Sequence, residues 1–449
     1  MYAYSTKQRS SRAIECHCRQ DVAYRVITGN LVPDHATIAR FVVRHEGALA
    51  GLFSEVLRLC DRAGLVAPGV IAIDGSRLAG NANRNCSRGF EQIAREILAE
   101  HKALDEAEDE QFGDARGDEL PERLRTPEGR REFFAQAKQR LEGEDTDRGE
   151  AEPEPEAGAA AEGEFEFDAE RIVARVQGRE GWLRDARRQL EDRRWREPDP
   201  ISRSRPERLL LAVERLEDEL DAERRGNEAY EEYRAQGRMK NGRRFGGPPK
   251  PYQPPEVPGG RVNVTDPDSK LMKVTEGYVQ GYNAQAVVDE GQIVLAAEIT
   301  TSTADWSQLD PMVTAAIGEL ERAGVSRRPQ IALADAQYWN EEHIDEVIAN
   351  KHVQVLIPPD SGTRQTPRPG WTGGRYTFMR SVLASEVGEQ LYRKRKQMIE
   401  PVFGHTKHNR GVTRFHRRGR AAVRTEWRLL MATHNLTKLH RHTIATQEA

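Results

Sequence analysis

The feature of this 449-residue chain that most constrains its fold is one short apolar strand that lies far from the others in sequence. The run GVIAIDGSRL, at residues 69–78, is rich in Val and Ile and too short for a helix, so it predicts a buried strand that ends at Asp74. The next strand patterns, GYVQGYNAQAVVD and QIVLAAEITT, begin only at residue 277 and are joined by an Asp-Glu-Gly hairpin turn. A long insertion therefore separates the first strand from the rest of its sheet.

The elements after this hairpin alternate between helix and strand. We predict a helix over 305–324, a strand over 330–335, a helix over 340–351, a strand over 353–358 and a final helix that carries Glu400. This order predicts an α/β fold in which helices surround a mixed sheet.

The remaining regions are helical and charged. Residues 1–65 predict a helical domain whose TGNLVP break suits a helix-turn-helix unit docking on DNA, although a plain helical bundle explains the pattern equally well. Residues 80–260 read as an insertion of charged helices, with an acidic low-complexity stretch that predicts disorder and a Pro/Gly-rich linker. We therefore divide the chain into a helical domain at 1–65, a first catalytic-domain strand within 66–79, the insertion, and the remaining domain at 261–449.

Charge is distributed unevenly along the chain. The formal net charge is −4, yet from residue 361 to the end there are 18 Lys and Arg against 5 Asp and Glu. A basic end on an otherwise acidic chain favours a nucleic-acid surface, and Phe403, Phe415 and Trp427 within it indicate a folded segment rather than a solvated tail. The sequence shows no membrane span or secretory signal, and its four cysteines lack zinc-type spacing, so we expect reduced thiols in the cytoplasm.

Three carboxylates are the candidate site. Asp74 and Asp335 come at predicted strand ends, where functional side chains of α/β sheets collect. Glu400 is a single acid in the basic stretch KQMIEPVFGHTKHNRG, either as a neutraliser of surface charge or as a metal ligand among phosphate-binding cations. Three such acids can hold one or two Mg²⁺ ions, which would activate an attacking oxygen and stabilise the leaving oxygen of a phosphodiester.

The order and flanks of these residues resemble the DDE transposases of bacterial insertion sequences. The matching stretches are VIAIDGSRLAGNANRN, NVTDPDSKLMKVTEGYVQGYNAQAVVD, IALADAQYW, YRKRKQMIEPVFGHTKHNRG and WRLLMATHNLTKL. The resemblance implies an RNase H-like catalytic domain and an N-terminal helical transposase domain. It implies that Asp74, Asp335 and Glu400 bind Mg²⁺, or Mn²⁺, and that Lys396, Lys407 and Arg410 contact DNA.

The function that the resemblance implies is metal-dependent cleavage at the ends of an insertion sequence, followed by transfer of the freed strand into target DNA. The expected partner is double-stranded DNA, at the terminal inverted repeats and at the target, bound by a homodimer in the nucleoid. Two alternatives stay open: an RNase H-like nuclease without strand transfer, and an inactive remnant that only binds DNA.

Several residues depart from the related pattern or compete with the three acids. Lys396 stands where relatives have Arg, and Gln337 stands where they have a glycine that could require a positive φ. Three other aspartates could compete as metal ligands: Asp266 and Asp268 are expected to build turns instead, and Asp305 to cap the next helix. Pro401 is expected to kink or restart its helix and free the carbonyl of Gln397, while Lys396 and Lys407 face outward.

Overall fold

The computed structural model describes residues 1–100, 167–169, 178–196, 204–239, 242–247, 251–253, 255–275, 277–360, 366–368, 371 and 373–448. Most of the acidic stretch predicted to be disordered lies outside these residues. The chain forms two compact units: Met1–Ala82 joined with Ser269–Ala449, and Asn83–Asp268.

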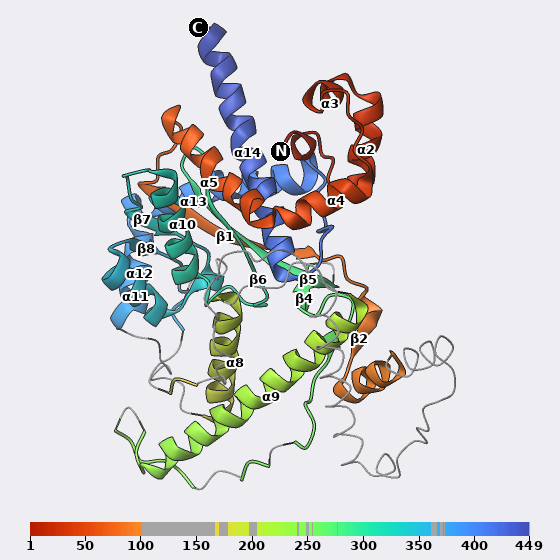
Figure 1. Cartoon of the computed structure of the whole chain (residues 1–449). Helices are drawn as coiled ribbons and strands as arrows, with labels where there is room; N and C mark the ends of the chain where they lie inside the picture. The colour runs from red at the N-terminus through yellow and green to blue at the C-terminus, as the bar shows by residue number, and fades with distance from the viewer. Residues whose placement is uncertain are drawn as a thin grey trace, which may run out of the picture. The chain divides into compact units, whose positions relative to one another are not determined.

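A six-stranded mixed sheet forms the centre of the first unit (Figure 1). Its strands are β1 (Val70–Ala79), β4 (Lys270–Val274), β5 (Gly277–Asp289), β6 (Val294–Thr300), β7 (Ile331–Leu333) and β8 (Gln354–Leu356). Five strands follow the order β4-β5-β1-β7-β8, and β6 also pairs with β5. The β1–β5 pair is antiparallel, whereas β1–β7 and β7–β8 are parallel. The first strand thus joins the late strands, and the expected RNase H-like α/β fold is confirmed.

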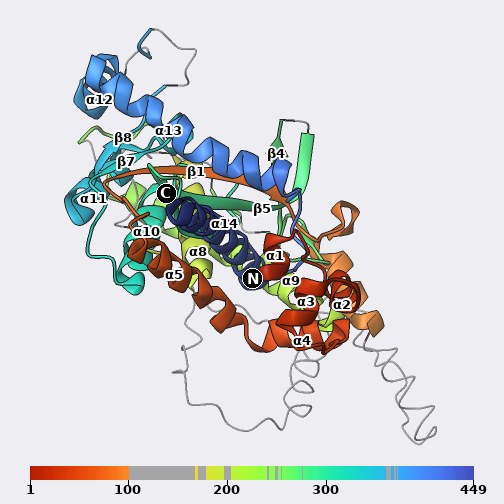
Figure 2. The same cartoon turned by 90° about the horizontal axis from the view of Figure 1, so that it is seen from above.

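Helices flank this sheet on both faces. The helices of this unit are α1 (Tyr2–Ser5), α2 (Ser11–Gln20), α3 (Val22–Ile27), α4 (His35–Arg44), α5 (Glu46–Arg62), α10 (Leu309–Ala323), α11 (Glu341–Lys351), α12 (Gly374–Ala384), α13 (Glu386–Gly404) and α14 (Arg420–Glu448), of which α10, α11, α13 and α14 contact the strands. Figure 2 shows α13 and α14 on opposite sides of β1 and β5. The side chain of Asp34 caps α4 by accepting from the Thr37 amide at 2.7 Å.

The basic C-terminal region belongs to the core of this unit. Trp427 on α14 is fully buried and donates its indole N–H to the Gln285 carbonyl of β5 at 2.8 Å. Phe403 and Phe415 are also buried, and their rings lie 6.1 Å and 6.3 Å from that of Trp427. The prediction that this region is folded rather than a solvated tail is therefore confirmed.

Gly281 makes the closest backbone approach in the sheet. It pairs with Ala79, and a Cβ atom at Gly281 would lie 2.0 Å from the carbonyl oxygen of Leu78 in β1. We expect Gly281→Ala to lower the free energy of unfolding by about 3 kcal/mol, because the obstructing atom is backbone and cannot rotate away. Urea unfolding measures this loss. Gly318→Ala on α10, whose Cβ would come no closer than 3.6 Å to any atom, is the control and should be neutral or stabilising.

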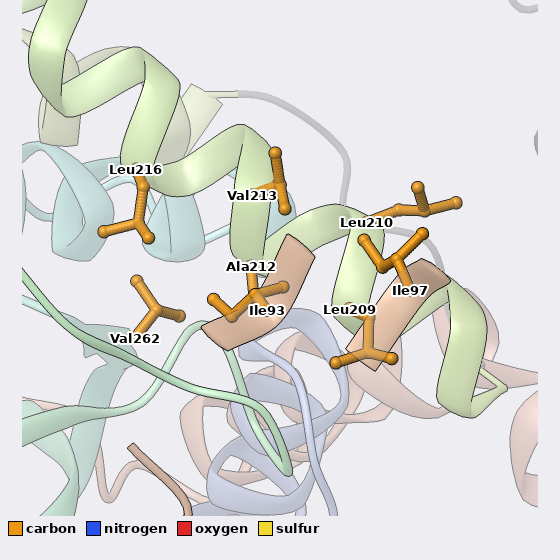
Figure 3. Packing of buried hydrophobic residues seen from close by; sticks show 8 residues of the cluster. All are labelled: Ile93, Ile97, Leu209, Leu210, Ala212, Val213, Leu216 and Val262. Atoms are coloured by element: carbon orange, nitrogen blue, oxygen red, sulfur yellow. The ribbon is translucent and has the colours of Figure 1, made fainter. Parts of the chain in front are cut away.

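The second unit contains a hairpin of two long helices. They are α8 (Arg179–Arg196) and α9 (Arg205–Ala235), and the unit also holds β2 (Ser87–Arg88) paired with β3 (Val262–Asn263). Ser204 and Glu207 form a capping box that begins α9. Figure 3 shows the apolar side of α9 packed against residues from both ends of the unit. The members of this cluster are Ile93, Ile97, Leu209, Leu210, Ala212, Val213, Leu216 and Val262.

None of the helices in the described ranges has the length and apolar character needed to cross a membrane.

Candidate active site

Asp74 and Asp335 lie at the same level on neighbouring parallel strands. The β1–β7 pairing ends at Ala72 and Leu333, and each aspartate follows two residues later on its own segment. Side chains alternate with a period of two along extended strands about 4.8 Å apart, so this register brings the two carboxylates together on one face. The prediction that the first strand ends at Asp74 is wrong. β1 continues to Ala79, because β5 pairs with it beyond the end of β7.

The protonated forms of both aspartates are favoured by their surroundings. Burial, followed by the charge of Asp335, raises the pKa of Asp74 to about 6, against the opposing effect of Arg395. Burial is also the main cause that raises the pKa of Asp335. The positive charge of Arg395 therefore offsets only part of the effect of burial on the two carboxylates, as expected of acids that are arranged to bind a cation.

Arg395 connects Asp74 with Glu400. Its guanidinium donates to Asp74 Oδ2 at 3.0 Å, and its other terminal nitrogen lies 3.8 Å from Glu400 Oε1. Arg395 is only 7% exposed, whereas the side chain of Glu400 is 53% exposed. Glu400 thus lies at the outer rim of the site, with a buried cation between it and Asp74.

Sequence reasoning missed Arg395, although its spacing contained a signal. Arg395 shares one helical face with three buried residues, Met398, Ile399 and Val402, at the i, i+3, i+4, i+7 positions of an inward-facing stripe. An arginine on that stripe has to meet an acid inside the fold. The position one residue later, Lys396, is exposed, as expected.

Lys407 and Arg410 lie differently from the prediction. Lys407 is half-buried, and burial lowers the pKa of its ammonium while the charge of Asp74 opposes this shift, so Lys407 is not a fully exposed surface cation. Arg410 is 8% exposed and donates to the carbonyls of Leu430 at 2.8 Å and Tyr4 at 3.0 Å. These bonds link α1 and α14 to the end of the π turn and leave Arg410 little surface for the DNA contact that the sequence predicts.

The helix around Glu400 does not restart at Pro401. Helix α13 includes this proline and passes directly into a π-helical turn, His405–Asn409, which carries Lys407. The freed Gln397 carbonyl is confirmed, since it accepts from the Gln292 side chain at 2.8 Å. Single π turns within helices occur frequently at functional sites, and Lys407 lies within this one.

The competing residues also have defined positions. Asp268 pairs with Arg215 in the second unit at 3.1 Å, and Asp266 is fully buried there. Asp305 does not cap α10, whose N-cap is Gln308. Gln337 lies in the 3₁₀ helix Ala336–Tyr338 without a positive φ, so the predicted strain at this position is absent.

The three predicted acids fit a hard divalent cation in donor type and in charge. Asp74 and Asp335 offer half-buried carboxylates with raised pKa values, and Glu400 offers a third carboxylate from α13. In the part of the chain that the structure describes, no group of three or more His, Cys, Asp or Glu side chains is close enough to hold a metal ion. The guanidinium of Arg395 lies where Asp74 and Glu400 would have to converge.

Residues 363–440 match the family model described as transposase DDE domain. The chain carries a transposase DDE domain. The matched segment includes α13 with Glu400, the π turn and the first two-thirds of α14. The resemblance to the DDE transposases is thereby confirmed, and the class of enzyme indicated is a nuclease or transposase that acts on DNA. No curated protein and no solved structure matches the chain.

Proposed function

We propose that this protein is the transposase of an insertion sequence, which cleaves the ends of its element and joins them to target DNA. The observation that carries the proposal is the register of Asp74 and Asp335 on β1 and β7, facing a helix of the transposase DDE domain through Arg395. Asp74, Asp335 and Glu400 would hold Mg²⁺, or Mn²⁺, which supplies Lewis-acid stabilisation of a phosphodiester under attack.

The side chains of this centre have separate roles in the proposed reaction. A water oxygen attacks the phosphorus, the bond from phosphorus to the 3′-oxygen breaks, and a 3′-hydroxyl is released. That hydroxyl then loses its proton to water and attacks a phosphorus of the target strand, where the bond from phosphorus to the target's own 3′-oxygen breaks and releases a target 3′-hydroxyl. Lys407, beside Asp74, neutralises charge on the phosphate under attack, and the exposed Lys396 holds the DNA backbone outside the centre. Arg395, which donates to Asp74 Oδ2, would keep the Asp74 carboxylate in the orientation that holds the metal ion.

Joining two element ends requires two active centres, so we propose that the protein acts as a homodimer on DNA. One experiment separates the proposal from its two alternatives: the protein is incubated with labelled end DNA, a target plasmid and Mg²⁺. Joined products support the transposase. Nicks alone indicate a nuclease without strand transfer, and a mobility shift without cleavage indicates an inactive DNA-binding remnant.

Replacing Lys396 by Ala is expected to weaken binding of end DNA and to lower the slope of log affinity against log salt by about 0.9, the value for one phosphate contact. Fluorescence anisotropy at several salt concentrations measures both quantities. Lys351→Ala on α11 removes the same charge elsewhere and should leave the slope unchanged. An unchanged slope for Lys396→Ala would remove this residue from the DNA surface.

A further inference from the structure

A buried polar network lies on the opposite face of the sheet from Arg395. In the β1–β5 register, Gly75 faces Gln285 and Arg77 faces Asn283. These positions alternate with Asp74, so their side chains project away from the face where Asp74 meets α13. Asn283 and Gln285 are 1% and 0% exposed, and Asp305, in the loop between β6 and α10, is 6% exposed.

Asp305 accepts hydrogen bonds from three side chains of this network, and Gln285 Nε2 also donates to Asn283 Oδ1 at 3.1 Å. Its Oδ1 accepts from Asn283 Nδ2 at 2.7 Å and from Gln285 Nε2 at 2.8 Å. Its Oδ2 accepts from Arg77 at 3.3 Å. Both carboxylate oxygens of Asp305 thus accept hydrogen bonds on the face of the sheet away from Asp74, so Asp305 is not placed to share a metal with Asp74.

The network extends to the turn that presents Asp335. The hydroxyl of Tyr338 donates to Gln285 Oε1, and Tyr338 is fully buried. Arg77 also donates to Gln337 Oε1 at 3.4 Å. Gln337 and Tyr338 belong to the 3₁₀ helix that Asp335 caps, where Asp335 Oδ1 accepts from the Gln337 amide at 2.8 Å. The Gln337 amide that donates to the Asp335 carboxylate therefore lies in a turn whose Gln337 and Tyr338 side chains are held by Arg77 and Gln285, the partners of Asp305.

The same network packs closely against the backbone of Gly75, next to Asp74. A Cβ atom at Gly75 would lie 2.2 Å from Gln285 Nε2, 2.8 Å from Asn283 Oδ1 and 2.9 Å from Asp305 Oδ1. Only glycine leaves room for these three side chains directly beneath the peptide that follows Asp74.

We infer that Asp305 is a positioning residue, which sets the relative placement of Asp74 and Asp335 through Gln285, Tyr338 and the backbone of Gly75. The inference rests on the proposed function, because it assigns Asp305 to the same metal-dependent centre. Losing Asp305 removes one acceptor from each of its donors. Asn283 and Gln285 then keep only longer bonds, to the Ser302 carbonyl at 3.4 Å and to Asn283 Oδ1 at 3.1 Å, so Gln285 and its partner Tyr338 are held less firmly. A displacement of about 1 Å at the acids can cost a factor of about 10² in rate.

The test compares Asp305→Ala, Asp305→Asn and Tyr338→Phe, with Asp310→Ala in the first turn of α10 as the matched control. We expect Asp305→Ala and Tyr338→Phe to lower the rate of end-DNA cleavage by about 10²-fold and to raise the Mg²⁺ concentration for half-maximal rate. Binding of end DNA should change less than about twofold, since no DNA-facing cation is altered. Asp305→Asn retains an oxygen for both amide donors and should recover most of the rate.

Hydrogen exchange of the wild-type and variant proteins without DNA tests the inference independently of activity. In Asp305→Ala and Tyr338→Phe the amides of residues 336–338 should exchange at least about tenfold faster, whereas Asp310→Ala should leave them unchanged. Wild-type exchange at 336–338 in both Asp305→Ala and Tyr338→Phe overturns the inference, whether or not the wild-type protein cuts DNA. A wild-type protein that does not cut DNA, with the expected change in exchange, overturns only the proposed function. Normal cleavage and Mg²⁺ dependence in both variants also overturns the inference.

Discussion

Replacing Asp74 by Asn is expected to stabilise the metal-free protein while abolishing DNA cleavage. Burial and Asp335 raise the pKa of Asp74 from an ordinary value of 3.8 to about 6. The folded state therefore holds the proton more tightly than the unfolded state, and this contribution to stability is lost as the pH rises from about 4 through 6. The raised value already includes the attraction of Arg395, and the charge of Asp335 still faces Arg395 in the variant. An uncharged Asn should therefore make the protein more stable by about 2 kcal/mol at pH 8 and leave it nearly equal at pH 4.

Cleavage by Asp74→Asn should fall by about 10³-fold, because removing one ligand carboxylate forfeits several kcal/mol of transition-state stabilisation. Thermal unfolding with and without Mg²⁺ supplies the second readout: Mg²⁺ should stabilise the wild-type protein at pH 8 and leave the variant unaffected. Asp310→Asn, outside the site, is the control. Equal stability of Asp74→Asn and wild type at pH 8, with cleavage retained, would contradict this role for Asp74.

Replacing Arg395 by Met should have the opposite effect on stability. Arg395 is buried against Asp74, and removing one partner of a buried pair costs about 3 kcal/mol because the other charge is left uncompensated. The loss should be largest at pH 8, where Asp74 is ionised, and should shrink at pH 5, where the unpaired carboxylate takes up a proton instead. Urea unfolding at the two pH values measures the difference.

Two further variants identify the source of that loss. In the Asp74→Asn background, Arg395→Met should cost much less, because no buried carboxylate is left unpaired. Arg393→Met, on the same helix, removes a guanidinium whose pair with Glu389 is exposed, and should change stability by less than about 0.5 kcal/mol. A loss from Arg395→Met that is the same at both pH values and in both backgrounds would mean that Arg395 acts through packing alone.

The sheet was predictable because apolar runs with strand composition stand out locally. The β5–β6 hairpin and the strands β7 and β8 follow from such runs, and β1 follows from a single one. The continuation of β1 beyond Asp74 was not predictable in this way. It depends on Gly75 and Arg77 pairing with β5, whose position beside β1 is a property of the tertiary fold.

The candidate site was predictable only in part, because side chains that act through tertiary partners leave weak local signals. The strand-end position and the helix motif indicated Asp74, Asp335 and Glu400, whose roles stay predictions. Asp305 looked like a helix cap, since its partners Asn283 and Gln285 lie about 20 residues earlier in the chain. Arg410 looked like a surface cation, and its two carbonyl acceptors belong to α14 and the N-terminal segment.

Glu400 is the residue on which the metal centre depends most, because it is the most exposed of the three acids and Arg395 separates it from Asp74. The measurement that tests the account most directly is cleavage of end DNA in Mg²⁺ and in Mn²⁺ by wild type, Glu400→Gln and Glu400→Cys. Glu389→Gln, an exposed acid at the start of the same helix, is the control.

We expect Glu400→Gln to bind end DNA as tightly as wild type but to cut it at least about 10³-fold more slowly, with Mg²⁺ and with Mn²⁺. Glu400→Cys should be inactive in Mg²⁺ and partly active in Mn²⁺, because a thiolate is a poor ligand for the harder ion. Glu389→Gln should cut normally. If Glu400→Gln cuts at the wild-type rate in Mg²⁺, Glu400 only balances surface charge, and the three-acid centre proposed for this transposase DDE domain is wrong.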